Sequence, residues 1–253
     1  MLRKEIPLWI MFGGFSLALI GGCLNAIGFL GVYHQAVSHM SGTVTTLGLN
    51  LANDNGDAIL RTLSVIFSFF LGALLSGFII RQSTLKAGRR YGVALAVESA
   101  LLFAATHLLR HDLRLGYYIA AMACGLQNAM ATSYSGAVVR TTHVTGIITD
   151  LGIACGHVLR RQNVEWRRFG LYGVLLAGFL SGGYLGAIGY SHLGYDTLLF
   201  PATLAGCTGL GYAIFKHIER QQHERSQQAL LLDLPNASVH KRIEEYRKRF
   251  SKG

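Results

Sequence analysis

Apolar residues are gathered into six long runs along the chain, and shorter polar stretches separate them. Each run is long enough, and poor enough in charge, to cross the hydrocarbon core of a bilayer as an α-helix. We therefore predict an all-α polytopic membrane protein with about six transmembrane helices. Their predicted ranges are 7–32, 62–80, 91–109, 115–138, 169–190 and 197–215.

Two further segments are apolar but short for a crossing, and both are rich in Thr, Ser, Gly, Asn or Asp. They are residues 39–53, called here the first motif segment, and residues 143–159, the second motif segment. Over fourteen aligned positions, beginning at His39 and His143, the residues His, Gly, Thr, Leu and Gly are identical. The sequence thus contains the same polar element twice inside apolar surroundings.

The likeness extends on both sides of the motif segments. Upstream, Asn25-Ala26 matches Asn128-Ala129, and downstream the spacing of Gly72 and Gly77 matches that of Gly178 and Gly183. An internal duplication of this kind is typical of transporters built from two structural repeats. We predict two membrane repeats, 1–110 and 111–216, followed by a basic cytoplasmic tail, 217–253.

Loop charges discriminate between two topologies, because Lys and Arg favour the cytoplasmic side. If both motif segments cross, eight spans result, the repeats are parallel and the basic 81–90 loop faces outside. If both dip in and return, the 81–90 loop, the 140–168 region and both termini are cytoplasmic. The repeats are then inverted. We prefer this re-entrant arrangement, whose one discrepancy is the 110–114 connection, where two arginines face outside.

Composition supports a membrane protein and excludes an ordinary soluble domain. The chain has 51% hydrophobic and 14% charged residues, with 31 glycines among 253 residues. The net charge of +10 does not indicate nucleic-acid binding, because the basic residues lie in short loops and the tail, where they meet anionic lipid headgroups. Four scattered cysteines without a C-x-x-C spacing predict neither a metal site nor a disulfide, and we expect no cofactor. The N-terminus lacks a small-residue cleavage site, so we interpret its apolar run as a retained span.

The motif segments carry the candidate chemistry. We expect each to form a short helix whose N-terminus lies near the membrane midplane, with free N–H groups and a partial positive charge. Ser38 or Ser41 is the expected N-cap of the first. Two such N-termini suit a small anion or a neutral hydrogen-bonding solute. The predicted solute contacts are His39, Ser41, Gly42 and Thr43 in the first segment and His143, Thr145, Gly146 and Asp150 in the second.

Three further polar residues lie deep in predicted spans. Asn25 and Asn128 are candidates for solute contact, although support of the motif loop or helix-to-helix bonding is the preferred interpretation. Glu98 is a proton-site candidate, or a partner for a neighbouring hydroxyl. Structural alternatives also exist for the motif residues: each His could bond a backbone carbonyl, and Asp150 could reach water or pair with a basic residue at the cytoplasmic end. The glycines are expected to allow close helix contact, which permits a homo-oligomer.

The tail changes character after the last span. Residues 216–232 and 239–250 are predicted as two short helices interrupted at 234–236. We expect the tail to touch anionic lipid, with a partner-binding helix as the alternative. Its predicted amphipathic face comprises Ile243, Tyr246, Arg247 and Phe250.

Two stretches resemble the signature of the YoaK family, bacterial membrane proteins of unknown function. They are Gly22-Cys-Leu-Asn25-Ala26-Ile-Gly28-Phe29 and Ser38-His39-Met40-Ser41-Gly42-Thr43. Members of that family usually have Asp-Ala near Asn25-Ala26 and His-Met-Thr-Gly-Asn at the motif, so this chain departs at Asn25, Ser41 and Thr43. The resemblance covers about residues 8–215. It implies a membrane fold and location, and no activity.

The function that these patterns favour is a transporter or channel for a small polar or anionic solute, bound between the two motif segments in the bacterial cytoplasmic membrane. A non-transporting scaffold or sensor that signals through the tail is the alternative. An intramembrane enzyme with His39 or His143 as base is less favoured, because the sequence lacks H-E-x-x-H, a nucleophile elbow and a phosphate loop.

Overall fold

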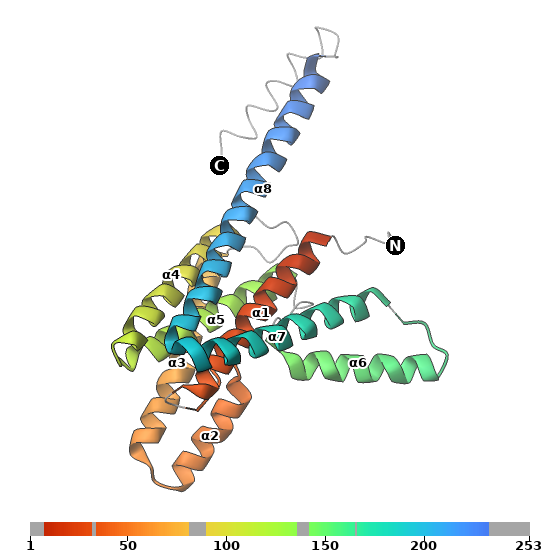
Figure 1. The fold of residues 1–253 in the computed structure, drawn as a ribbon. Coiled ribbons are helices and arrows are strands. Elements are labelled where there is room, and N and C mark those ends of the chain that lie inside the picture. The colour runs from red at the N-terminus through yellow and green to blue at the C-terminus, as the bar shows by residue number, and fades with distance from the viewer. Residues whose placement is uncertain (1–7, 32–33, 81–89, 136–141, 165, 233–253) are drawn as a thin grey trace. The chain divides into compact units, whose positions relative to one another are not determined.

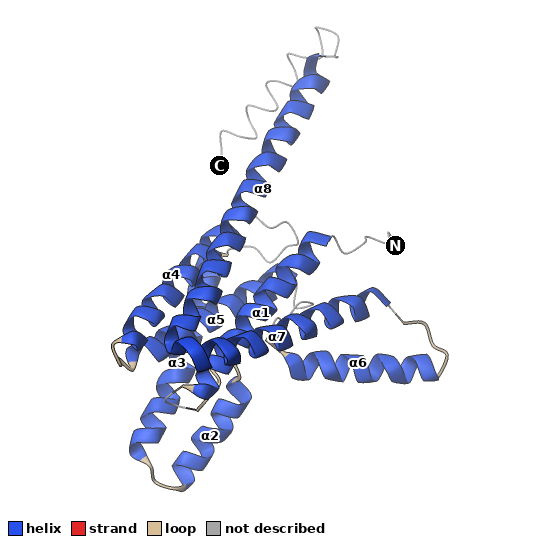
Figure 2. Ribbon diagram, viewed as in Figure 1, coloured by secondary structure: helices blue, strands red, loops and turns tan. Residues whose placement is uncertain are grey.

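The computed structural model describes residues 8–31, 34–80, 90–135, 142–164 and 166–232, and the secondary structure of this part of the chain is entirely helical (Figure 2). The described chain divides after Leu210 into a larger unit, residues 1–210, and a smaller unit, residues 211–253. The elements, labelled in Figure 1, are α1 (Leu8–Leu30), α2 (Met40–Ala52), α3 (Gly56–Ile79), α4 (Arg90–Arg110), α5 (Leu115–Ser135), α6 (Val144–Leu159), α7 (Trp166–Leu193), the 3-10 helix η1 (Gly194–Leu198) and α8 (Leu199–Leu232).

Four described stretches have the length and apolar composition of membrane spans: 10–30, 56–79, 90–110 and 168–222. The last covers most of α7 and of α8, with η1 between them. The helix α5 is not among them, although a crossing was expected at 115–138, because polar residues such as Gln127, Asn128 and Thr132 interrupt its apolar sequence. Membrane-helix character is therefore established for the chain, and the count of six spans is not.

Two helix boundaries differ from those expected. The helix α3 begins at Gly56, six residues before the expected start at 62, because the Asn55 side chain accepts a hydrogen bond from the Ala58 backbone N–H and caps the helix. The helix α8 continues without a break from the last predicted span to Leu232, where a separate tail helix was expected from 216. The 81–89 loop, Arg140 and the tail face at 243–250 lie outside the described residues.

The helix α1 runs parallel to α7 and antiparallel to α5. Along the first pair, Gly178 lies against Phe15 and Gly186 against Cys23, so the numbers rise together. Along the second pair, the Gln127 side chain donates to the Leu17 carbonyl. The Tyr117 hydroxyl donates to the backbone carbonyl of Gln35. The backbone N–H of Gln35 in turn donates to the Gly28 carbonyl near the end of α1. Position 17 therefore faces 127, and position 28 lies near 117.

The other neighbours fix the remaining directions. The helices α3 and α5 are parallel: Arg61 and Tyr117 line one cavity, and Gly72 lies on Met122 and Leu126 further along both helices. The helix α4 is antiparallel to α5, because Tyr91 bonds Met130 while Leu109 packs on Gly116. It is also antiparallel to α8, where Ser99 bonds the Ala202 carbonyl and Gly209 lies against Leu95. Within the larger unit, α1, α4 and α7 thus run one way and α3, α5 and α8 the other.

Close backbone contacts at glycine join α1 to α7 and α3 to α5, which we call the crosswise contacts. A Cβ placed on Gly22 of α1 would lie 2.0 Å from the Phe179 carbonyl oxygen of α7. One placed on Gly125 of α5 would lie 2.0 Å from the Phe69 carbonyl oxygen of α3. No side chain fits at such distances, so glycine is required at both places. The expected role of glycine in close helix contact is confirmed at these positions.

Candidate functional site

The chain that enters α2 is held by Asn25. This amide, 8% exposed in the last turns of α1, makes three hydrogen bonds with Ser38. Its Nδ2 donates to the Ser38 hydroxyl at 2.8 Å, and its Oδ1 accepts from the Ser38 backbone N–H at 3.0 Å and from the hydroxyl at 3.1 Å. The polar groups of these two buried side chains are thereby satisfied inside an apolar bundle. Support of the motif loop, the preferred interpretation for Asn25, is what these bonds provide.

Asn128 makes the corresponding contact in the second half of the chain. Its Oδ1 accepts a hydrogen bond from the Thr142 hydroxyl at 3.2 Å, and the Thr142 methyl group lies against Gly21 of α1. Ser38 and Thr142 each immediately precede the histidine of a motif segment. The two segments therefore enter at places only four residues apart along α1, at Asn25 and Gly21, which corresponds to about 6 Å of helix rise.

His39 and His143 are the N-cap residues of α2 and α6, with closely similar backbone angles, φ −92° and ψ 72° against φ −94° and ψ 59°. Neither side chain makes a capping hydrogen bond, and both residues are exposed. The prediction of Ser38 or Ser41 as the N-cap is wrong, because the Ser38 hydroxyl is taken by Asn25.

The two imidazole rings lie over the glycines of their own helices. A Cβ on Gly42 would come within 2.5 Å of the His39 ring, and one on Gly146 within 2.3 Å of the His143 ring. Glycine three residues after each His leaves room for the ring on the first turn. The histidines therefore lie beside the free N–H groups of the helix N-termini.

The hydroxyl residues of the motif segments divide by burial. Thr43 is buried, and both its N–H and its hydroxyl bond the His39 carbonyl. Ser41 and Thr145 are exposed, and their carbonyls accept hydrogen bonds from Thr45 and Thr149 one turn later. Ser41 and Thr145 thus face away from the packed interior, as Thr45 and Thr149 also do.

The two candidate carboxylates lie in contrasting places. Asp150 is exposed on α6 and accepts a hydrogen bond from the Tyr172 hydroxyl of α7 at 2.8 Å. Glu98 in α4 is fully buried, and neither of its carboxylate oxygens has a hydrogen-bond partner in the described structure. Within that part of the chain no hydrogen bond or ion pair joins these two groups to His39 or His143, and no cluster of His, Cys, Asp and Glu could hold a metal ion.

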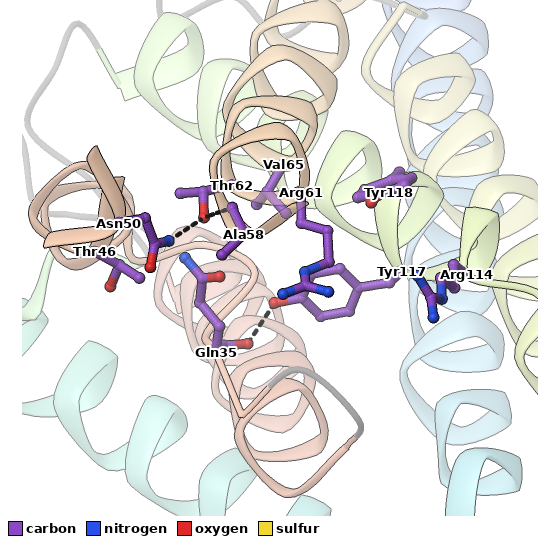
Figure 3. Close-up of a pocket in the computed structure, with 10 residues that line it drawn as sticks. All are labelled: Gln35, Thr46, Asn50, Ala58, Arg61, Thr62, Val65, Arg114, Tyr117 and Tyr118. Carbon is purple, nitrogen blue, oxygen red and sulfur yellow. Dashed lines mark hydrogen bonds between the residues drawn. The ribbon is translucent and has the colours of Figure 1, made fainter. Parts of the chain in front are cut away.

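A polar cavity borders the first motif segment, and the sequence analysis missed it. It has a volume of about 330 Å³ and is open on one side. Figure 3 shows side chains from four parts of the chain around it, with Gln35 pointing toward Asn50 and Thr62. Its principal polar residues are Gln35, Asn50, Arg61, Thr62, Arg114 and Tyr117.

Two signals in the sequence could have indicated this cavity. Arg61 lies inside a helix of membrane-spanning length, where a lone charge is costly and is usually functional. Arg114 belongs to the connection that conflicts with the positive-inside rule. Both arginines line the cavity, but more than fifty residues separate them in the sequence, so neither signal alone indicates it.

Comparison with known proteins gives one match. The family model described as protein of unknown function (DUF1275) matches residues 13–232. No curated protein and no solved structure matches the chain.

Proposed function

Because the chain belongs to the DUF1275 family, the domain of unknown function carried by the YoaK family, we propose its function from its own geometry: it is a transporter for a small polar or anionic solute. The solute binds where the two motif segments approach α1. The observation that carries this proposal is the pair of matched contacts, Ser38 with Asn25 and Thr142 with Asn128 and Gly21.

In the proposed topology α1, α3, α4, α5, α7 and α8 cross the membrane, while α2 and α6 lie on re-entrant segments. The opposite directions of α1 and α3 support this, since the chain between them must begin and end at one side. The same holds between α5 and α7. Because α1 and α5 are also antiparallel, residues 1–110 and 111–216 form an inverted repeat. The contacts of Gly22 with Phe179 and of Gly125 with Phe69 are those that such a repeat requires.

The orientation follows from charge, with both termini in the cytoplasm of a bacterial cell and the 31–38 and 110–114 connections outside. The outward arginines were the discrepancy in this arrangement. In the structure, Arg110 pairs with Asp196 of η1, and Arg114 lines the cavity. Both arginines therefore have polar surroundings at the outer side, so their position there conflicts less with this topology.

The site then joins two helix N-termini from opposite sides of the membrane. Their partial positive charges favour an anionic or hydrogen-bond-accepting group. We assign solute contact to His39, Ser41 and Gly42 of the first segment and to His143, Thr145 and Gly146 of the second. Thr43, expected from the sequence as a contact, is buried and bonded to the His39 carbonyl, so we assign it to the support of the first turn. Asn25 and Asn128 position the segments. Glu98 and Asp150 are proposed as polar groups along the pathway, and burial without a partner makes Glu98 the candidate for proton exchange.

Flux through purified protein in liposomes tests the proposal. We expect uptake of at least one of radiolabelled phosphate, succinate, acetate or glutamate above that of empty liposomes. His39→Ala and His143→Ala should each lower it about tenfold, the effect of losing one hydrogen bond to a charged group. Folded yield should be unchanged. His192→Ala, an exposed histidine near the end of α7, is the matched control.

Other outcomes would favour other functions. Equal loss of folded yield in the His39 and His143 variants would assign them a structural role. Chemical turnover of a lipid or solute without flux would favour an intramembrane enzyme. Capture of a partner protein that depends only on the tail would favour a scaffold or sensor.

The topology has its own test in a variant without the four native cysteines. Single cysteines replacing Gln35, Asn53 and His192 should react with an impermeant thiol reagent on intact cells, and one replacing Gln162 should not. If the cysteine at 35 reacts and the one at 53 does not, the first motif segment crosses the membrane and the inverted repeat is wrong.

A further inference from the structure

The polar cavity lies where the chain returns after α1 and where α2, α3 and α5 come together. Gln35 comes from the return, Asn50 from α2, and Arg61 and Thr62 from the beginning of α3. Arg114 immediately precedes α5. All these positions belong to one end of the larger unit. In the proposed topology that end is the outer one, so the cavity opens toward the cell exterior.

Its charge is uncompensated. Arg61 and Arg114 line the cavity, and no acidic side chain does. Within the part of the chain that the structure describes, neither guanidinium forms an ion pair, whereas Arg110, four residues before Arg114, pairs with Asp196. Arg61 is half-buried, and Arg114 is exposed at the rim of the cavity. A half-buried cation without a counter-charge is costly, so the cavity favours an anionic occupant.

The neutral donors in the cavity divide into satisfied and unsatisfied groups. Asn50 donates to the Thr62 hydroxyl at 3.2 Å, which donates in turn to the Ala58 carbonyl at 2.8 Å. The Gln35 side chain, in contrast, has a buried Nε2 with no hydrogen-bond partner. Its backbone carbonyl is occupied by Tyr117 and does not serve that amide. An unpartnered buried N–H₂ group beside unpaired arginines requires an acceptor that the described chain does not supply.

We propose that this cavity binds an oxyanion, the carboxylate or phosphate group of a small solute that enters from outside. The planar forks of Arg61 and Arg114 match the paired oxygens of such groups, and the Gln35 amide donates a further hydrogen bond. A volume of about 330 Å³ is at the small end of pockets for small molecules, which suits a compact solute. The site deepens the proposed function by naming the anionic class, and it serves as the outer receiving site of the transport pathway.

Equilibrium binding of radiolabelled inorganic phosphate and of succinate tests the site without requiring transport. The full-length protein is placed in nanodiscs made only of phosphatidylcholine, which removes anionic headgroups. We expect saturable binding of at least one probe. Arg61→Gln and Arg114→Gln should each weaken it about tenfold to a hundredfold, because each removes a charge-assisted hydrogen bond. Gln35→Leu should weaken it by a smaller factor.

Arg110→Gln is the matched control, since it removes an arginine at the same end of the unit that pairs outside the cavity. It should leave probe affinity unchanged. Arg61→Lys separates charge from geometry: it keeps the cation, loses the fork and should retain part of the affinity. Circular dichroism verifies that each variant is folded before it is compared.

Three results would overturn the inference. The first is no binding of either probe by the folded protein, and the second is equal weakening by Arg61→Gln and Arg110→Gln. The third is arginine-dependent binding of phosphatidylglycerol, added to the nanodiscs, in the absence of binding by either free probe. That result would assign the cavity to a lipid headgroup. Failure of the proposed function can be told apart from failure of this site. Arginine-dependent binding without flux would support the anion site and contradict the transporter. Flux that is insensitive to Arg61→Gln would support the transporter and contradict the anion site.

Discussion

The helices α2 and α6 begin in the same way and continue differently. In each, an asparagine holds the residue before the N-cap, histidine is the N-cap, and its ring lies over a glycine. Beyond the first turn α2 packs along α3 and borders a cavity with two arginines (Figure 3). The helix α6 meets α7 chiefly at Ile147 and at the bond between Asp150 and Tyr172, and most of its other residues are exposed.

This difference distinguishes the structural features that the repeated sequence determines from those that the neighbouring helices determine. The shared residues orient the helix N-terminus, and that part is alike in both halves. The surroundings of α2 depend on Tyr117 and Arg114 of the other half, which are not part of the motif. A motif can therefore be duplicated while the side chains around its two copies differ.

The largest expected effect tests the part that the halves share. Gly22→Ala and Gly125→Ala should each destabilise the protein by about 3 kcal/mol or more, because the added Cβ meets a backbone carbonyl that cannot move without separating two helices. Unfolding in sodium dodecyl sulfate, followed by circular dichroism, measures this. The control is Gly77→Ala, where nothing lies within 4 Å of the added Cβ and the change should stay within about 1 kcal/mol. Similar loss in all three variants would show that close helix approach is not the cause.

The next effect should distinguish the halves. Asn25→Ala removes three hydrogen bonds to a buried serine and should cost about 2–3 kcal/mol. Asn128→Ala removes the one bond to Thr142 and should cost about 1 kcal/mol. The same unfolding assay compares them. Equal costs would mean that the second loop is held as firmly as the first, contrary to the described contacts.

The smallest effect concerns the outer parts of α2 and α6. The amide hydrogens of α2 should exchange more slowly than those of α6, because α2 has the more extensive packing. Asn50→Ala should loosen α2 by about 1 kcal/mol, while Tyr172→Phe should loosen α6 by about 0.5 kcal/mol, since its bond to Asp150 is exposed. Hydrogen exchange followed by mass spectrometry resolves both. Faster exchange in α2 than in α6 would reverse the comparison.

The helices could be predicted from the sequence because apolar runs of the right length leave few alternatives, and both motif segments form the short helices expected. The start of α3 was missed although Asn55 before Gly56 is a recognisable N-cap signal. The expected correspondence between Gly72 and Gly178 stays a prediction, but the contacts suggest a pairing one helical turn further along α7. In the structure Gly182 lies on Leu19 as Gly72 lies on Met122, so the glycine whose contact resembles that of Gly72 is Gly182.

The site was predictable only where it depends on local sequence. The motif histidines and Asn25 could be identified because their neighbours recur at matching positions. The cavity could not, since Arg61, Arg114 and Gln35 come from three separate segments and only the fold brings them together. The burial of Glu98 without a partner likewise depends on which helices surround α4, and the sequence of α4 does not contain that information.

The crosswise glycine contacts have a consequence for biogenesis. The helix α1 leaves the ribosome early, but its partner α7 is synthesised more than half a chain length later, and α3 must likewise wait for α5. The glycine faces of the first-made helices therefore stay in contact with lipid or an insertase until their partner helices have been synthesised. The two halves cannot mature as independent modules, so co-expressed fragments cut between α4 and α5 should be stable together and degraded apart.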